Sequence, residues 1–174
     1  MTARTASIHA SAVLVGDRAV LIRGPSGAGK SRLAFKLILA GRGGQLPPAI
    51  LVGDDRVHLD TVAGQTWVRP APKLAGLIEI RGLGIRRCEY ANEAVVGLVV
   101  DLSASDAERL PFPETLVTSL DGVSLPRIPV AAGFDALLLI AAALTTTAGS
   151  GPSRPLDDCP KLFGNHISPT IATE

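Results

Sequence analysis

One segment near the amino end combines glycines, a lysine and a serine at a spacing that binds phosphate groups. It matches the pattern G-x-x-x-x-G-K-S in full, as Gly24, Pro25, Ser26, Gly27, Ala28, Gly29, Lys30 and Ser31. Glycines let successive backbone N–H groups turn toward phosphate oxygens, and a helix that begins at the lysine points its positive end at the same anion. Lys30 is expected to contact the β and γ phosphates and Ser31 to bind Mg²⁺. The pattern predicts nucleoside triphosphate binding and leaves the reaction open.

Two places in the chain could supply the carboxylate that such a loop needs beside its metal. Asp54 and Asp55 follow the apolar run 50–52, and Asp101 follows the apolar run 98–100. Adjacent side chains on extended backbone point to opposite faces, so one acid of the pair could enter the site while its neighbour contacts another group. A carboxylate near metal and phosphates could accept a proton from a hydroxyl nucleophile. The strand pattern favours Asp101, and the unusual pairing favours Asp54 and Asp55.

Short apolar runs and turn residues predict the elements that position these groups. Strands or extended segments are expected at 11–15, 19–22, 50–52, 57–59, 66–68, 78–80, 94–102 and 123–130. Helices are expected at 32–40, ending at Gly41, and at 135–144, the second of them buried. This order predicts an α/β fold, a P-loop kinase core with an extended, partly antiparallel mixed sheet.

Composition limits the possible classes of protein. A chain of 174 residues with 47% hydrophobic and 19% charged residues fits one globular domain. A net charge of +1 and only six aromatic residues (one Trp, one Tyr, four Phe) argue against a nucleic-acid partner. The most apolar stretch, 137–144, is shorter than the ~20 residues of a membrane span. Cys88 and Cys159 lack a disulfide or metal-binding spacing, so a cytoplasmic protein with reduced thiols is expected.

Taken together, these segments resemble the catalytic domain of the HPr kinase/phosphorylase family. The similarity includes Ile8–His9, the phosphate-binding loop and the segment Leu51–Val57, which contains the acid pair. Its most specific part is Leu77–Ile85, which closely matches the family's signature segment, and a fainter match is Glu108–Leu110. The family uses ATP and Mg²⁺ to phosphorylate a serine of the phosphocarrier HPr in the bacterial phosphotransferase system, and reverses this step with inorganic phosphate. The resemblance therefore implies a protein serine kinase with ATP and Mg²⁺ as cofactors, an HPr-type partner and a homo-oligomeric state.

The resemblance also implies a role for each matching position. Lys30 and the loop amides would hold the nucleotide phosphates, and Ser31 and Glu79 would coordinate Mg²⁺. Either Asp54 or Asp55 would accept the proton of the acceptor serine. The remaining implied site residues are His9 beside the acid pair, Arg109 as an anion contact, and the substrate-facing segment Arg81, Gly82, Leu83 and Gly84.

Some positions depart from the family pattern. Arg32 stands where the family commonly has glutamate, and a cation in the first helical turn opposes the helix dipole. Residues 128–134 read Ile-Pro-Val-Ala-Ala-Gly-Phe and lack the arginines of the family's dephosphorylation loop, which argues against phosphorylase activity. Only six residues precede Ser7, so the chain resembles the short form found in alphaproteobacteria. We expect a catalytic domain at 1–147 and a flexible tail at 148–174. A non-catalytic nucleotide sensor, or a small-molecule kinase that uses Asp101, remains an alternative.

Overall fold

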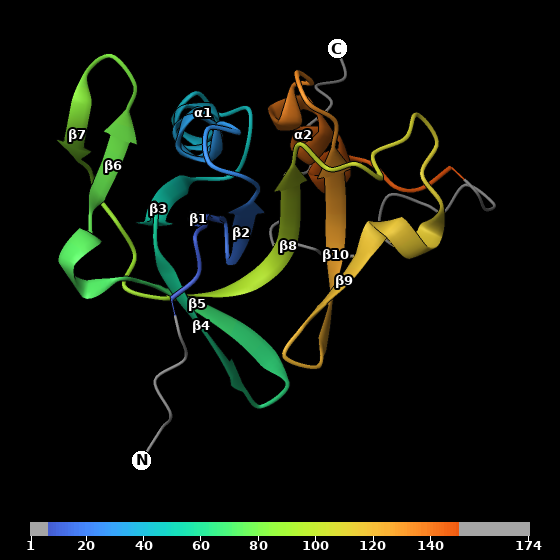
Figure 1. Cartoon of the computed structure of the whole chain (residues 1–174), viewed down its shortest axis with the longest axis horizontal. Helices are drawn as coiled ribbons and strands as arrows, with labels where there is room; N and C mark the ends of the chain where they lie inside the picture. The colour runs from blue at the N-terminus through green and yellow to red at the C-terminus, as the bar shows by residue number, and fades with distance from the viewer. Residues whose placement is uncertain (1–6, 150–174) are drawn as a thin grey trace, which may run out of the picture.

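A large mixed sheet carries the phosphate-binding loop between its central strand and a covering helix (Figure 1). The computed structural model describes residues 7–149. Six strands follow the order β3-β1-β2-β8-β10-β9, and the β4–β5 hairpin joins them through β5 and β8. The strands of this sheet are β1 (Ser11–Val15), β2 (Arg18–Arg23), β3 (Ala49–Gly53), β4 (Val57–Val62), β5 (Gln65–Pro70), β8 (Ala94–Leu102), β9 (Val117–Leu120) and β10 (Val123–Val130).

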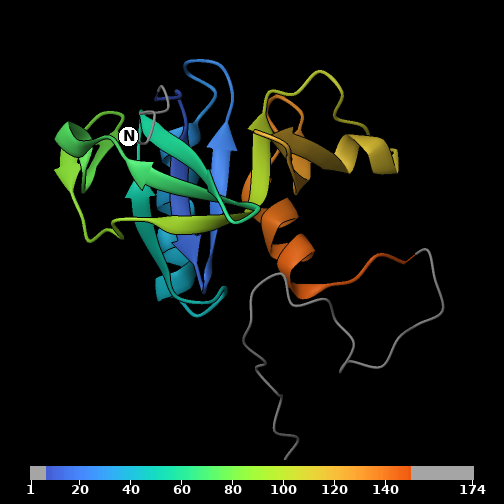
Figure 2. The same ribbon diagram turned by 90° about the horizontal axis from the view of Figure 1, so that it is seen from below.

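Helices and a small hairpin complete the described part of the chain. Helix α1 (Lys30–Arg42) packs against β1 and β3, and α2 (Ala136–Thr145) follows β10. The hairpin of β6 (Leu77–Ile80) and β7 (Gly84–Arg87) and the strand β9 lie at opposite ends of the molecule (Figure 2). Two short 3₁₀ turns are η1 (Pro72–Leu74) and η2 (Pro113–Leu116).

The pairing directions agree with the expected fold class. Strand β8 runs parallel to both β2 and β10, whereas β1 pairs antiparallel with both β2 and β3. The P-loop leaves the carboxyl end of β2 and enters α1, as the apolar run before the motif and the helical spacing after it predict. The expected α/β fold with an extended, partly antiparallel mixed sheet is confirmed.

Strand β8 contributes to two separate hydrophobic cores. Leu98, Val100 and Leu102 pack in the cluster beneath α1, whereas Ala94 and Val96 pack in the cluster beside the β4–β5 hairpin. The change of face occurs at Gly97, where the register against β2 is irregular. A Cβ at Gly97 would lie 2.8 Å from the Cβ of Arg18, so the absence of a side chain permits the close approach. The irregularity thus keeps Ala94 and Val96 on the same face of the sheet as Val99, while the residues that alternate with Val99 face α1.

The structure differs from the sequence expectations in three elements. The prediction did not include β7 and β9, because neither has a buried residue and so neither carries an inward-facing apolar pattern. Helix α2 is present and begins at the N-cap Asp135, but the expectation of a buried helix is wrong: among its residues Ala136 and Ile140 are buried, while Leu138 is 69% exposed. An all-round apolar sequence does not reveal that a neighbour covers just one face.

The two ends of the chain are only partly covered by the structure. The predicted tail at 148–174 lies almost entirely outside the described residues, and its flexibility stays a prediction. No helix within residues 7–149 is long and apolar enough to cross a membrane.

Candidate nucleotide-binding and catalytic site

The phosphate-binding loop has the backbone shape that its glycines predict. Gly24, Gly27 and Gly29 have φ values of +145°, +80° and +96°, which side-chain-bearing residues rarely adopt. A Cβ added at Gly27 or Gly29 would meet no atom within 4 Å, so these two glycines border open space. Helix α1 has no side-chain cap and no acidic residue in its first turn. Its first N–H groups and its dipole therefore favour an anion at this end.

Lys30 is folded into the loop. It is 6% exposed, and its Nζ donates hydrogen bonds of 2.9 Å to the carbonyl oxygens of Gly24 and Pro25. Burial lowers the pKa of Lys30, an effect that the carboxylates of Asp54 and Asp55 partly offset. The ammonium is thus held within the loop by backbone acceptors that phosphate oxygens could replace.

The paired acids point into different surroundings. Asp54, directly after β3, is 3% exposed: its Oδ1 accepts a 2.5 Å hydrogen bond from Ser11 Oγ, and its Oδ2 accepts one of 3.1 Å from the backbone N–H of Glu79. Asp55 has a left-handed φ of 65°, and its side chain is 64% exposed. Its Oδ1 lies 3.3 Å from Nε2 of His9. The left-handed backbone at Asp55 thus separates the two carboxylates and leaves that of Asp55 as the more accessible one.

A cavity of about 600 Å³ brings the loop and Asp55 together, and Asp54 does not line it. Loop residues 26–31 form one side, and His9, Asp55 and Glu79 reach it from other elements. Ser31, which carries a hydroxyl, and Glu79, which carries a carboxylate, both line it. Because Mg²⁺ binds through one or two protein oxygens together with phosphates and water, this donor set fits magnesium beside a nucleotide. Within residues 7–149, no three His, Cys, Asp or Glu side chains are grouped to hold a metal.

The other residues implied by the resemblance differ in their position relative to this cavity. Arg81 lines it, whereas Gly82 and Leu83 lie in the exposed β6–β7 turn and Gly84 is the exposed first residue of β7. Arg109 is exposed on the segment between β8 and η2, and lines neither this cavity nor a second one described below.

Asp101, the alternative metal-side acid, is occupied by other partners. Arg23 donates from Nε to Oδ1 at 2.7 Å and from Nη2 to Oδ2 at 2.8 Å, and Arg127 donates from Nε to Oδ2 at 2.5 Å. Asp101 lines neither cavity. This geometry gives it a structural role at the adjacent ends of β2, β8 and β10, and favours the acid pair for chemistry.

The sequence analysis did not select Ser11, which the structure places against Asp54. The Ser11 side chain is fully buried at the start of the otherwise apolar strand β1. A buried hydroxyl requires a hydrogen-bond partner, so a serine at this inward position was the available signal.

Comparisons with known proteins identify what the chain resembles as a whole. Residues 1–150 match the family model described as HPr Serine kinase C-terminal domain. The chain is 36% identical over 156 residues to the HPr kinase/phosphorylase of Azoarcus sp. (strain BH72), with coverage of 81% of this chain and 47% of the relative. The corresponding Geobacillus kaustophilus protein is 37% identical over 152 residues, with coverage of 79% and 46%. The chain thus spans about half the length of these curated relatives.

A comparison with solved structures also finds a protein of this kind with a similar fold. The chain aligns with the structure of the Hpr(Ser) kinase/phosphatase from Coxiella burnetii at a TM-score of 0.62 and 25% sequence identity. The alignment covers 79% of this chain and 87% of that one.

Proposed function

Because the chain belongs to the HPr serine kinase C-terminal domain family, we propose that it transfers the γ-phosphoryl group of ATP to a serine hydroxyl of an HPr-type phosphocarrier protein. One observation carries this proposal: a single cavity is lined by the phosphate-binding loop and by Asp55 with its neighbour His9. A phosphate donor and a hydroxyl activator are therefore available in the same space. The small-molecule kinase alternative requires Asp101 beside the metal, and it is weakened because Arg23 and Arg127 already bind the carboxylate of Asp101.

The loop binds the donor in this mechanism. Backbone N–H groups of residues 26–31 and the amino end of α1 surround the phosphates, and Lys30 neutralises charge on the β and γ groups. Ser31 and Glu79 would hold Mg²⁺, which when bound offsets negative charge on the same phosphates. Most of the rate enhancement would come from positioning and charge neutralisation.

Asp55 acts on the acceptor. It accepts the proton of the serine hydroxyl as the serine oxygen bonds to the γ phosphorus and the bond from that phosphorus to the bridging oxygen breaks, with ADP as the leaving group. His9, 3.3 Å from Asp55, orients its carboxylate. Residues 131–134, Ala-Ala-Gly-Phe, offer no cation to inorganic phosphate, so the forward reaction is the one proposed.

The test is phosphoryl transfer from labelled Mg·ATP to a panel of HPr-type carriers. Wild type should label one carrier serine, and a carrier with that serine replaced by alanine should stay unlabelled. Lys30→Ala and Asp55→Asn should reduce transfer by about 10²–10⁴-fold. Asp121→Asn, a matched exposed acid in the β9–β10 turn, should leave transfer unchanged.

Two results would contradict the proposal. Nucleotide binding without transfer to any carrier supports a sensor, and label on a small metabolite supports a small-molecule kinase.

A further inference from the structure

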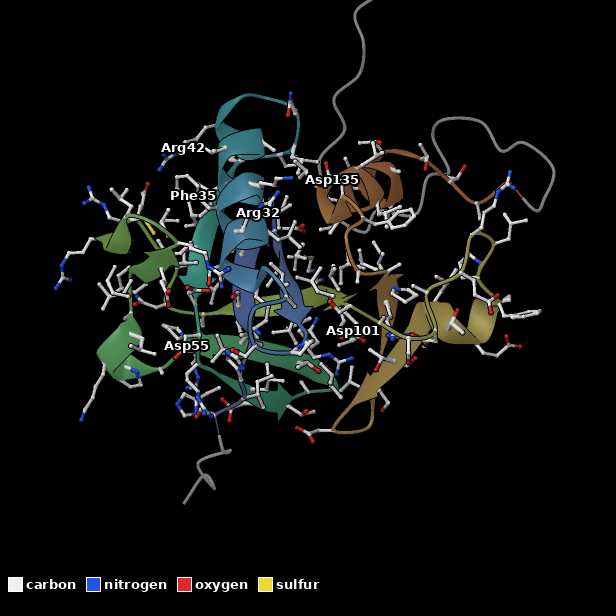
Figure 3. All side chains as sticks on the ribbon, turned by 45° about the horizontal axis from the view of Figure 1, so that its top comes forward. Arg32, Phe35, Arg42, Asp55, Asp101 and Asp135 are labelled. Carbon is white, nitrogen blue, oxygen red and sulfur yellow. The ribbon has the colours of Figure 1, made fainter. Side chains whose placement is uncertain are left out.

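A second cavity, of about 400 Å³, adjoins the first around the start of α1. Four residues line both cavities, namely Ala28, Gly29, Arg32 and Lys36. The remaining wall of the second cavity comes from Leu33, from Leu102 at the end of β8, and from the segment 133–136 between β10 and α2. Figure 3 labels Phe35 and Asp55 on one side of α1 and Asp135 on the other. The two cavities therefore meet at the phosphate-binding loop and diverge along opposite sides of the helix.

The acidic residues of the first cavity determine which end of a bound nucleoside triphosphate faces that cavity. His9, Asp55 and Glu79 line the first cavity and do not line the second. The γ phosphate must face Asp55 for a hydroxyl to be activated beside it, as proposed above. The nucleoside is attached at the other end of the triphosphate, so it leaves the loop away from these acids. The second cavity lies next to the loop in that direction.

The second cavity presents an aromatic ring with an uncovered face. Phe134 lines it and is 72% exposed, in a tight turn where Phe134 N donates to the carbonyl of Ala131 at 3.2 Å and Gly133 has a φ of +83°. The ring belongs to neither hydrophobic cluster of the described residues. Phe35, the aromatic residue of the first cavity, is partly buried against the α1 core. Phe134 is thus the ring with apolar surface left to cover, and every nucleobase offers a flat face that stacks on such a ring.

Charge at the junction of the cavities fits the same ligand. Arg32 is exposed in the first turn of α1, where its cation opposes the helix dipole in the free protein. A hydrogen bond from Lys36 lowers the pKa of Asp135, and the nearby charge of Arg32 adds to this effect. A phosphate group at this helix end would give the Arg32 cation a second anion and offset the unfavourable interaction with the dipole. Lys36, one turn later, lies 3.2 Å from Asp135. Arg32 is accordingly available on the path between the phosphate-binding loop and Phe134.

We propose that the second cavity is the nucleoside subsite, where Phe134 stacks on the base and Arg32 contacts the phosphate nearest the ribose. The proposal rests on the proposed function in one respect, namely that the loop binds a nucleoside triphosphate. Stacking reads the face of a base and not its edge, so ATP and GTP should depend on Phe134 to a similar extent.

The experiment separates the base from the phosphates. Calorimetry would measure the dissociation constants of Mg·ATP, Mg·GTP and Mg·tripolyphosphate for the whole chain. Phe134→Ala should weaken both nucleotides about tenfold and leave tripolyphosphate unchanged, and Phe134→Tyr should restore nucleotide affinity. The matched control is Phe112→Ala, which removes another exposed ring, 66% exposed and outside both cavities, and should change nothing.

Distinct outcomes overturn the subsite and the proposed function. Equal nucleotide affinity in wild type and Phe134→Ala, or an equal loss for ATP and tripolyphosphate, overturns the subsite. So does a nucleotide-specific loss in Phe35→Ala that is absent from Phe134→Ala, since it would place the base in the first cavity. If tripolyphosphate binds neither wild type nor any variant, or binds Lys30→Ala as well as wild type, the phosphate-binding role of the loop fails first.

Discussion

At the scale of single residues, the paired acids show how adjacent, chemically identical side chains acquire different roles. Both carboxylate oxygens of Asp54 accept hydrogen bonds from residues of other elements. The side chain of Asp55, by contrast, is mostly exposed to solvent and lies beside His9. The left-handed backbone at Asp55 produces the difference, because it turns the second carboxylate away from the first. Asp54 is therefore a positioning residue that fixes the backbone of Glu79, and Asp55 is the candidate proton acceptor.

Matched amide variants should separate these roles. Asp54→Asn replaces one acceptor oxygen by an NH₂ group that faces a donor, so the free energy of unfolding should fall by about 1–3 kcal/mol. Asp55→Asn should leave stability within about 0.5 kcal/mol and reduce phosphoryl transfer by about 10²–10⁴-fold. Urea unfolding and transfer rates measure the two effects. A large stability loss in Asp55→Asn, with none in Asp54→Asn, would reverse the assignment.

Ser11 should contribute to stability through a single hydrogen bond. Ser11→Ala leaves Oδ1 of the buried Asp54 without its donor and should lower the free energy of unfolding by about 1–3 kcal/mol. Ser119→Ala, on the exposed side of β9, provides the control and should cost less than about 0.5 kcal/mol. Equal unfolding midpoints for the two variants would show that the Ser11 contact adds nothing.

At the scale of elements, an ionic cluster joins the ends of three neighbouring strands. Arg23 ends β2, Asp101 lies near the end of β8, and Arg127 lies in β10. Arg127 also donates to Asp106 and to the carbonyl of Thr115, so it ties the segment after β8 to the same cluster. The cluster holds together the strand ends beside the phosphate-binding loop.

This cluster predicts a pH dependence of stability. Burial by itself would raise the pKa of Asp101, but hydrogen bonds from Arg23 and Arg127 hold it below its usual value. A carboxyl group with a lowered pKa in the folded state adds stability above its unfolded pKa of about 3.9, and this stability is lost as the pH falls through the folded pKa. Asp101→Asn should therefore cost about 2 kcal/mol at pH 7 and progressively less below about pH 4.

Unfolding in urea across this pH range measures the effect. Asp121→Asn, in an exposed turn, should show a small difference from wild type with no such trend. A cost for Asp101→Asn that stays constant down to pH 2 would mean that the hydrogen bonds to arginine do not lower the pKa.

The irregular strand pairing at Gly97 gives a second element-scale prediction. Gly97→Ala introduces a Cβ 2.8 Å from the Cβ of Arg18, so one strand must shift and the free energy of unfolding should fall by about 1–3 kcal/mol. Gly43→Ala is the control, since Gly43 has an ordinary φ of −81° and its nearest neighbour would be 3.4 Å away. Thermal melting compares the two, and equal melting temperatures would show that β8 and β2 accommodate the methyl group.

At the scale of the whole molecule, local patterns in the sequence predicted the helices and the strands that have buried residues, whereas contacts between distant segments were not predicted. The G-x-x-x-x-G-K-S motif and the apolar run of β8 are continuous in the chain, so spacing alone revealed them. The bond from Ser11 to Asp54 joins positions 43 residues apart, and that from Arg23 to Asp101 joins positions 78 apart. Such partners become visible only when the sheet order is known. The second cavity escaped for the same reason, because three separate segments form it.

The packing of strand β8 in both hydrophobic clusters has a consequence for the unfolding of the protein. Since residues of this strand pack in the cluster beneath α1 and also in the one beside the β4–β5 hairpin, loss of either cluster would leave one face of β8 without its packing partners and so destabilise the other cluster. Both should melt in one cooperative transition, and the amides of residues 98–100 should be among the last to exchange with deuterium. The cavity beside the phosphate-binding loop and the β4–β5 hairpin should therefore be lost together on unfolding, although no residue of that hairpin lines the cavity.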